Sequence, residues 1–288
     1  MKFKGIIPAL VTPFNEDYSV NYDSLKVLTN RLIDKGVDGF YVCGSTGESF
    51  LLEKEERKKI LESVVEETAG RVPVIAHVGD IWADRAAELA THAAKVGADA
   101  VSAVPPFYFK FTFDEIAEYY KIIQNAAGLP LIIYNIPVLS GVSVTSDNLG
   151  QIIAACDVEG IKFTSNDMFE LSKIRAAYPD LCLLNGFDEI FINALPVGIQ
   201  GAIGSTYNIM PEKFSKILKA FKAGDLESAA QTQKQANEII DILIKTDVKS
   251  GIKYILTKAG IPCGSCRRPF APLNKEKTDL LDKVLELL

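Results

Sequence analysis

Eight short apolar runs recur along this chain, and longer charged stretches with helical spacing separate them. Segments such as 52–70 and 83–99 carry apolar residues at helical spacing and end at or near a glycine. Near-continuous apolar strands that alternate with helices predict a parallel sheet covered by helices. The expected strands are 6–11, 39–44, 72–78, 99–105, 129–135, 158–164, 181–186 and 201–206.

The number of strands favours a closed barrel over an open sheet. An open doubly wound sheet usually has fewer strands, and no G-x-G-x-x-G dinucleotide fingerprint follows the first run. We therefore expect a (β/α)8 TIM barrel. After about residue 207 the pattern is only helical. We expect one domain over 1–288, with the barrel over about 1–225 and extra C-terminal helices over about 226–288 packed on it.

Charge and hydropathy exclude several classes of partner. The formal net charge is -6, which does not suit a nucleic-acid-binding surface. There is no basic amphipathic helix for a lipid surface, and no apolar stretch approaches the roughly 20 residues of a membrane span. Pro8 and Pro13 interrupt the N-terminal apolar run, and no small-residue cleavage site follows, so the run reads as a strand rather than a secretory signal. We expect a cytoplasmic protein.

The cysteines do not indicate a disulfide framework, because the chain has five and they are scattered. The one close pair is Cys263 and Cys266. A zinc site would need a second pair of ligands, and His77 and His92 lie far away in the sequence. A thioredoxin-like redox pair would open a helix directly after a strand. We expect reduced thiols and no metal site.

Two chemically distinctive side chains end neighbouring strands. Active sites of such barrels lie at the C-terminal ends of the strands. Tyr134 and Lys162 are one strand–helix unit apart, so their strands should be neighbours at about 4.8 Å. An amine beside a phenol suggests imine formation with a proton donor next to it. The alternatives are a lysine that extends to solvent and a tyrosine that bonds to any local partner.

The amine needs its surroundings to become a nucleophile. A free lysine is almost fully protonated at pH 7, whereas an apolar barrel interior disfavours the ammonium form. Gly160, Ile161 and Phe163 flank Lys162 and make such an interior plausible. An iminium formed with a ketone then serves as an electron sink for breaking or making a carbon–carbon bond.

The stretch CGSTGES, 43–49, follows the second expected strand. Its glycines free the backbone, and Ser45 and Thr46 add hydroxyls, so the loop can donate several N–H groups to a small anion such as a carboxylate. It is not a P-loop, because no Gly-Lys-Ser/Thr follows. The alternative is a tight strand-to-helix connection without a ligand.

NGFDE, 185–189, and GSTYN, 204–208, end the last two strands. Asp188, Glu189 and Ser205 can bind a polyol through hydrogen bonds, although either carboxylate can instead cap the following helix. Neither stretch supplies a nearby Arg or Lys, which disfavours a phosphorylated substrate.

Five motifs together resemble a known family: GSTGES, YNIP, KFTSND, NGFDE and GSTYN, in this order and spacing. The chain resembles the N-acetylneuraminate lyase (sialic acid aldolase) subfamily of the pyruvate-dependent class I aldolases, which also include dihydrodipicolinate synthase. The resemblance runs through essentially the whole chain. It implies a homotetrameric barrel enzyme that cleaves open-chain N-acetylneuraminate to N-acetylmannosamine and pyruvate without a metal or organic cofactor.

The resemblance also implies roles for individual residues. Lys162 matches the Schiff-base lysine and Tyr134 the proton-relay tyrosine. Ser45 and Thr46 match positions that hold the pyruvate carboxylate, and Ser45 also matches a member of the relay. Tyr108 falls where the family places an aromatic residue near the site and the subunit contact, or it simply packs in its loop. The positions that match contacts to the sugar portion are Thr164, Gly186, Asp188, Glu189 and Ser205.

One position departs from the synthase branch. After YN-x-P, that branch carries an arginine that receives the carboxylate of its aldehyde substrate, and here the residue is Leu139. An amino sugar, which lacks that carboxylate, suits leucine better, and a bidentate arginine is not easily replaced. Three alternatives stay open: an aldolase of keto-deoxy sugar acids, a dihydrodipicolinate synthase, and a non-catalytic sensor of 2-oxo acids or sialic acid.

Overall fold

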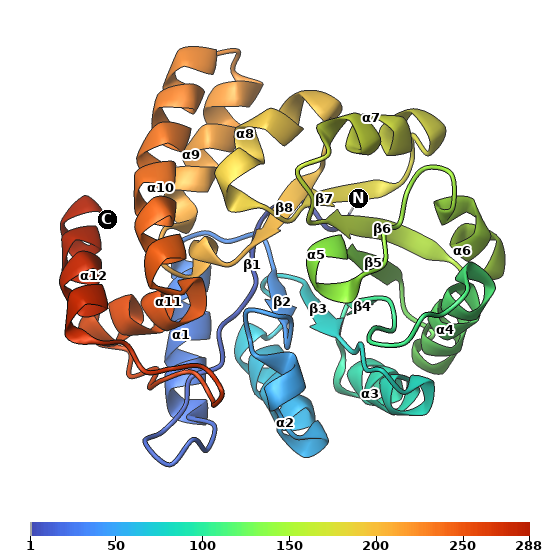
Figure 1. Cartoon of the computed structure of the whole chain (residues 1–288), viewed down its shortest axis with the longest axis horizontal. Coiled ribbons are helices and arrows are strands. Elements are labelled where there is room, and N and C mark those ends of the chain that lie inside the picture. Colours follow the sequence, from blue (N-terminus) through green and yellow to red (C-terminus); the bar gives the residue numbers. More distant parts are fainter. Residues whose placement is uncertain (1) are drawn as a thin grey trace.

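The centre of the computed structural model, which describes residues 2–288, is a cylinder of eight parallel strands (Figure 1). Every strand overlaps a run expected from the sequence, and Met1 lies outside the described residues. The strands are β1 (Gly5–Pro8), β2 (Phe40–Val42), β3 (Val74–His77), β4 (Ala100–Ala103), β5 (Leu131–Asn135), β6 (Val158–Phe163), β7 (Cys182–Asn185) and β8 (Gly201–Gly204).

The strand order closes the cylinder. The sheet runs β1-β8-β7-β6-β5-β4-β3-β2, with every pair parallel. The last gap, between β1 and β2, is bridged just beyond β1, where Ala9 pairs with Tyr41 and the N–H of Leu10 donates to the Tyr41 carbonyl at 2.9 Å. The predicted (β/α)8 TIM barrel is therefore confirmed.

Alternation along each strand separates two cores. Side chains on a strand point to opposite faces in turn. On β6, Ile161 and Phe163 pack in the outer core beneath the helices. Lys162, between them, therefore faces the barrel interior. The interior cluster is made of Phe3, Ile7, Ala9, Tyr41, Ile75, Ala100, Val104, Ile132, Tyr134, Ile136, Cys182, Leu184 and Ile203.

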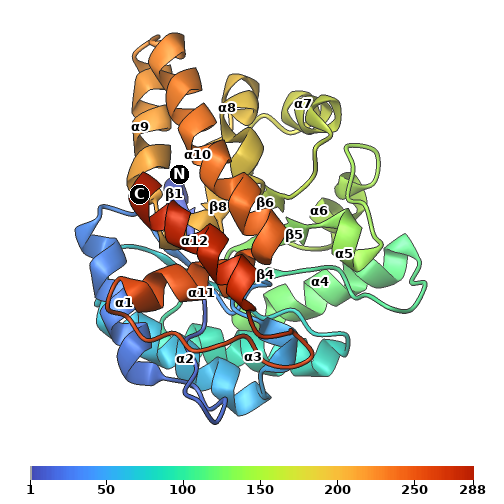
Figure 2. The same cartoon turned by 60° about the vertical axis from the view of Figure 1, so that its left-hand side comes forward.

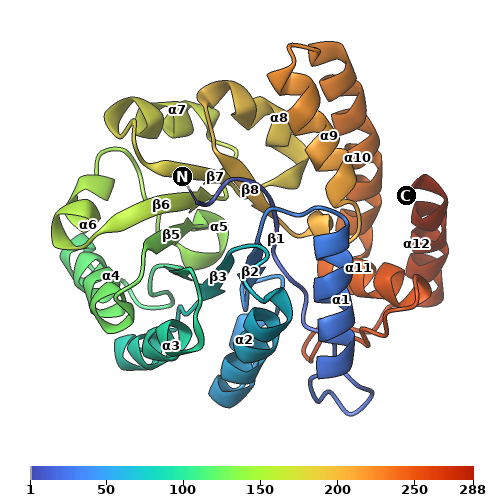
Figure 3. The same cartoon turned by 180° about the vertical axis from the view of Figure 1, so that it is seen from behind.

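The opposite end of the barrel is covered by the start of the chain. Phe3 precedes β1 and is buried in the interior cluster. Seen from behind, the N-terminal segment crosses the end at which the strands begin (Figure 3). The N-terminal segment does not cover the other end of the barrel, where the strands finish, so a functional site can form there.

Helices wrap the outside of the barrel, and local signals set their ends. In α4, Thr112 accepts from the N–H of Glu115, whose side chain accepts from the N–H of Thr112, and Gly128 ends the helix in the left-handed region. The helices of the first 222 residues are α1 (Tyr22–Asp34), α2 (Lys54–Thr68), α3 (Ala83–Val96), α4 (Phe113–Ala127), α5 (Pro137–Ser140), α6 (Leu149–Ala155), α7 (Met168–Ala177), α8 (Phe191–Ala194) and α9 (Pro211–Lys222). The short 3-10 turns in the same part of the chain are η1 (Ser49–Leu51), η2 (Asp188–Ile190), η3 (Leu195–Val197) and η4 (Thr206–Asn208).

Three further helices follow: α10 (Leu226–Thr246), α11 (Val248–Lys258) and α12 (Lys275–Leu287). α10 stands beside α9, and α11 and α12 turn back across the molecule (Figure 2). The bend falls at Asp247, which has a φ of +82° and whose side chain caps α11 by accepting from the N–H of Ser250 at 3.0 Å. Buried residues of all three helices join the outer core. Within residues 2–288, no helix combines the length and apolarity needed to cross a membrane.

Candidate active site

Lys162 and Tyr134 lie side by side at the mouth of the barrel. They are directly paired in the parallel register of β5 and β6, and Leu184 of β7 pairs with Lys162 on its other side. Lys162 is 4% exposed and Tyr134 is 3% exposed. The Lys162 Nζ lies 3.8 Å from the centre of the Tyr134 ring. Both side chains reach the same cavity.

The amine of Lys162 is surrounded by rings rather than by carboxylates. Its Nζ also lies 4.6 Å from the centre of the Tyr41 ring. In residues 2–288, no carboxylate oxygen lies within 4.0 Å of this nitrogen. Burial raises the pKa of Tyr41 well above its ordinary value, and its hydroxyl shares a 3.0 Å hydrogen bond with Ser102. Tyr41 is thus a neutral wall, and the nitrogen is left without an ionic partner that would hold it away from a carbonyl carbon.

The turn after β2 lies at the edge of the cavity and contains two backbone donors without a protein acceptor among residues 2–288. It is closed by hydrogen bonds from the N–H of Gly47 to the carbonyl of Gly44 at 3.0 Å and from the N–H of Glu48 to the carbonyl of Ser45 at 3.1 Å. Within the described chain, neither the N–H of Ser45 nor that of Thr46 has a protein acceptor. Two free adjacent N–H groups at the edge of a cavity suit a small anion.

The hydroxyls of this turn connect it to both sides of the barrel. The Tyr134 hydroxyl donates to Ser45 Oγ at 3.5 Å. The hydroxyls of Thr46 and Ser205 share a 2.6 Å hydrogen bond, although 159 positions separate them in the sequence. The hydroxyls of Tyr134 and Ser45 are therefore neighbours at the mouth of the barrel, and Ser205 bonds to the adjacent hydroxyl of Thr46.

Asp188 forms the opposite polar wall. Its Oδ2 accepts from the N–H and the hydroxyl of Thr206 at 2.9 Å and 2.7 Å. Within the described residues, its Oδ1 and the Thr164 hydroxyl are buried and have no hydrogen-bond partner, although burial and the nearby Asp188 raise the pKa of Tyr207 well above its ordinary value. Burial raises the pKa of Asp188 to about 6, although the bonds from Thr206 oppose the rise. Buried polar atoms are normally hydrogen-bonded, so we expect these two atoms to bond to water or to a ligand.

Two glycines leave room for this wall. A Cβ added to Gly186 would lie 1.9 Å from the Thr164 hydroxyl oxygen, and one added to Gly204 would lie 1.9 Å from Asp188 Oδ1. Any larger residue at these two positions would displace these polar atoms.

Nine of the residues predicted to form the site surround one cavity of about 320 Å³. Tyr108 is not among them: it is 86% exposed, has a φ of +76°, and packs its ring against Phe109. The nine residues are Ser45, Thr46, Tyr134, Lys162, Thr164, Gly186, Asp188, Glu189 and Ser205.

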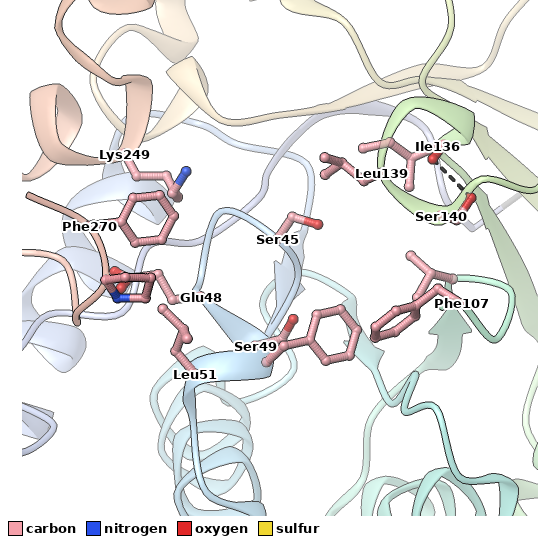
Figure 4. A pocket seen from close by; sticks show the side chains of 13 residues that line it. Ser45, Glu48, Ser49, Leu51, Phe107, Ile136, Leu139, Ser140, Lys249 and Phe270 are labelled. Atoms are coloured by element: carbon pink, nitrogen blue, oxygen red, sulfur yellow. Dashed lines mark hydrogen bonds between the residues drawn. The ribbon is translucent and has the colours of Figure 1, made fainter. Parts of the chain in front are cut away.

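A second, mainly apolar cavity of about 550 Å³ adjoins the first (Figure 4). Ser45, Ile136 and Lys249 line both cavities. In Figure 4, Lys249 and Phe270 face Leu139 across the space, with Ser45 between them. The Lys249 Nζ lies over the Phe270 ring, 4.3 Å from its centre. Leu139 therefore contacts the adjoining cavity rather than the one that holds Lys162.

The C-terminal helices contribute lining residues that the sequence did not reveal. Ile240 and Ile244 of α10, and Val248 and Lys249 of α11, line the cavity that holds Lys162. The prediction considered only the ends of strands, where a barrel site is expected. The signal in the sequence that bears on this is Asp247, an N-cap residue type between two helical stretches, since its side chain caps α11.

The histidines and cysteines do not line the cavity that holds Lys162, although the His77 ring centre lies 6.0 Å from that of Tyr134. His77 is buried, its Nδ1 lies 2.9 Å from the carbonyl oxygen of Cys43, and burial lowers its pKa well below the ordinary value. Cys263 and Cys266 are buried free thiols. Across residues 2–288, no three His, Cys, Asp or Glu side chains are grouped so that they could hold a metal ion.

Comparison with known proteins agrees with this geometry. The N-acetylneuraminate lyase of Citrobacter koseri is 44% identical over 277 residues, which cover 95% of this chain and 93% of the relative. The structure of CdNal from Clostridium difficile in complex with mannosamine has a TM-score of 0.96 at 35% identity, with 99% of each chain covered. A catalytic lysine mutant of the Ruminococcus gnavus sialic acid aldolase has a TM-score of 0.96 at 33% identity, covering 99% of this chain and 95% of that one.

The family assignment covers almost the whole sequence. Residues 2–288 match the model of the dihydrodipicolinate synthetase family. The match agrees with the eight-stranded barrel and with the position of Lys162 inside its mouth. This chain therefore belongs to the dihydrodipicolinate synthetase family.

Proposed function

We propose that this protein is an N-acetylneuraminate lyase, a class I aldolase that cleaves open-chain N-acetylneuraminate to N-acetylmannosamine and pyruvate through a Schiff base on Lys162. The observation that carries the proposal is the buried, ionically unpaired amine beside Tyr134, in a cavity that also offers two free N–H groups and a polar wall. The N-acetylneuraminate lyases among the relatives support the choice of substrate.

The first steps bind the 2-oxo acid and form the imine. The substrate carboxylate docks on the N–H groups of Ser45 and Thr46. The amine of Lys162 then attacks the C2 carbonyl carbon, and protonation of the resulting hydroxyl followed by loss of water gives the iminium.

Carbon–carbon cleavage follows. Tyr134 takes the proton of the C4 hydroxyl, directly or through the substrate carboxylate, while its own proton passes to Ser45 Oγ and Ser45 releases its hydroxyl proton to water in the cavity. The C3–C4 electron pair moves to the iminium and gives an enamine, while C4 becomes the aldehyde carbon of N-acetylmannosamine. Protonation at C3 and addition of water then release pyruvate and restore the amine.

The polar wall supplies discrimination for the sugar. Asp188 Oδ1 and the Thr164 hydroxyl are buried and unpaired within the described chain, so substrate hydroxyls can complete their hydrogen bonds. An analogue without those hydroxyls would leave the groups unpaired, which is the strongest form of rejection available to a binding site. Gly186 provides the space for this wall, and Glu189 and Ser205 extend it.

Borohydride reduction in the presence of pyruvate, followed by mass spectrometry, tests the proposal. We expect one covalent adduct, located at Lys162, and none in Lys162→Ala, which should fold and be inactive. Lys249→Met is the matched control, because Lys249 lines the same cavity and should not be the trapped lysine. A non-catalytic sensor would give no adduct. Faster turnover of a keto-deoxy sugar acid than of N-acetylneuraminate would reassign the enzyme to another pyruvate aldolase.

We also propose that the enzyme is a cytoplasmic homotetramer and that Tyr108 lies at a contact between subunits. The support is the exposed pair Tyr108 and Phe109, whose ring centres lie 5.1 Å apart, because adjoining exposed aromatic rings are unusual on a free surface. Tyr108→Asp should yield smaller species in analytical ultracentrifugation, whereas an unchanged sedimentation coefficient would place the contact elsewhere. The exposed aromatic residues on this part of the chain are Phe50, Trp82, Tyr108 and Phe109.

A further inference from the structure

A buried ion pair connects the turn after β2 to the C-terminal helix α11. The side chains of Glu48 and Lys253 are both 0% exposed, and Lys253 Nζ bonds Glu48 Oε1. The second oxygen, Glu48 Oε2, accepts from the backbone N–H of Arg267 at 2.8 Å. Both carboxylate oxygens are therefore used by the last part of the chain, and Glu48 does not offer them to the reacting atoms.

The backbone of Glu48 is part of the turn that carries the free N–H groups. Glu48 follows Thr46 by two positions, has a φ of +59°, and donates its N–H to the carbonyl of Ser45. Such a left-handed conformation is uncommon for a residue with a side chain and persists only where the surroundings hold it. The ion pair acts on this residue, so it acts on the orientation of Ser45 and Thr46 as well.

The same C-terminal segment holds the flanks of the turn. The guanidinium of Arg267 donates to the carbonyl of Leu51 at 2.7 Å and to Glu56 Oε2 at 2.6 Å. Lys253 Nζ lies 4.1 Å from the centre of the Phe14 ring, and the Arg267 guanidinium carbon lies 4.6 Å from it. Both cations thus contact the Phe14 ring, and one pairs with Glu48 inside the turn while the other pairs with Glu56 beyond it.

We propose that Glu48 and Lys253 are positioning residues: their ion pair holds the turn so that the N–H groups of Ser45 and Thr46 converge on the substrate carboxylate. This inference rests on the proposed function. A buried ion pair is a poor source of stability compared with an apolar pair of the same volume, so its presence at this turn calls for another reason. A site built from backbone donors needs its geometry fixed, and a shift of about 1 Å can cost about 100-fold in activity.

The test uses Glu48→Gln in the full-length enzyme, because glutamine has the same shape and no charge. We expect the KM for pyruvate in the condensation direction to rise about tenfold or more. The rise should not exceed the loss of about 100-fold that a shift of about 1 Å can cause. The KM for N-acetylmannosamine should change less than twofold. Borohydride with saturating pyruvate should still label Lys162, because the amine itself is untouched. This pattern separates loss of carboxylate binding from a general loss of folded enzyme.

Glu56→Gln is the matched control. It removes the carboxylate that pairs with Arg267 but lies outside the turn. Both variants should lower the melting temperature, and only Glu48→Gln should raise the KM for pyruvate. An unchanged KM in folded Glu48→Gln, or an equal rise in Glu56→Gln, would overturn the inference.

A conservative variant covers the case in which Glu48→Gln does not fold. Lys253→Arg keeps the charge and alters the geometry of the pair, so it should raise the KM for pyruvate by a smaller factor, with no change counting against the inference. If the wild-type enzyme forms no imine with pyruvate, the proposed function fails first, and the variants are not needed to show it.

Discussion

Tyr134 and Lys162 occupy paired positions on adjacent parallel strands, and the amine nitrogen of one lies 3.8 Å from the ring centre of the other. Two elementary rules produce this contact. Parallel pairing aligns the ends of β5 and β6, and alternation turns both side chains toward the barrel interior. The two residues to which we attribute proton transfer and imine formation are therefore held by paired strands of the barrel.

Removing the phenol should impair catalysis without preventing imine formation. We expect Tyr134→Phe to lower kcat by about 10²- to 10⁴-fold, the usual contribution of a positioned proton-transfer group. Pyruvate should still be trapped on Lys162 by borohydride. Tyr41→Phe is the control, because the Tyr41 ring also contacts Lys162 Nζ while its hydroxyl bonds Ser102. Equal losses of kcat in the two variants would contradict a specific role of the Tyr134 hydroxyl.

Asp188 should give the enzyme an acidic limb in its pH profile. Burial raises the pKa of Asp188 to about 6, so this carboxylate gains a proton as the pH falls through that value. The protonated acid accepts fewer hydrogen bonds from sugar hydroxyls, and kcat/KM for N-acetylneuraminate should therefore fall below about pH 6. In Asp188→Asn this limb should be absent and activity lower throughout. An identical limb in that variant would assign it to another group.

The same carboxyl should affect stability in the opposite direction. Its pKa is higher in the folded protein than in the unfolded chain, so the folded state binds a proton at pH values where the unfolded state does not. Its contribution therefore grows as the pH falls from about 6 toward the ordinary Asp value and is lost as the pH rises through 6. Relative to Asp188→Asn, we expect the wild type to gain about 1 kcal/mol between pH 7 and pH 5 in urea unfolding. A gain with rising pH would contradict the buried position.

Gly186 should tolerate no side chain. A Cβ there would lie 1.9 Å from the Thr164 hydroxyl oxygen and 2.8 Å from its Cβ, so Gly186→Ala must displace one polar wall of the cavity. We expect a rise of at least tenfold in the KM for N-acetylneuraminate, because roughly 1.4 kcal/mol of lost binding is sufficient for it. Gly150→Ala, inside α6, is the control and should be nearly neutral in activity. Unchanged kinetics of Gly186→Ala would mean that Thr164 does not contact the substrate.

The cysteines should resist alkylation in the native protein. Burial raises the pKa of Cys263 to about 12 and that of Cys43 to about 11. At pH 8 only about one Cys263 side chain in ten thousand is then a thiolate, the reactive form. Iodoacetamide labelling followed by peptide mass spectrometry should modify the half-buried Cys156 first, although its pKa is also raised. Fast modification of Cys263 would show that the C-terminal segment opens in solution.

Short-range patterns were sufficient for the barrel and for the pairing at its mouth. Apolar runs predicted all eight strands, and the spacing of one strand–helix unit predicted that Tyr134 and Lys162 are neighbours. Contacts between distant segments left no such pattern. No sequence pattern near Glu48 indicates that it contacts Lys253 or Arg267, because these contacts depend on how α11 packs after the bend at Asp247.

The position of Lys249 was unpredictable for the same reason. A lysine in the first turn of a C-terminal helix reads as an ordinary surface residue, and only the packed structure shows that it lines two cavities. The unpaired Oδ1 of Asp188 was equally unpredictable. The motif NGFDE does not indicate that Thr206 bonds to the other oxygen, Oδ2, and only the folded structure shows it.

The distance along the chain between Glu48 and Lys253, 205 positions, has a consequence for biosynthesis. The ribosome completes the strands, and with them the amine, well before it adds the cation that pairs with Glu48. A nascent chain that has closed its barrel but not yet gained α11 would therefore hold substrate weakly.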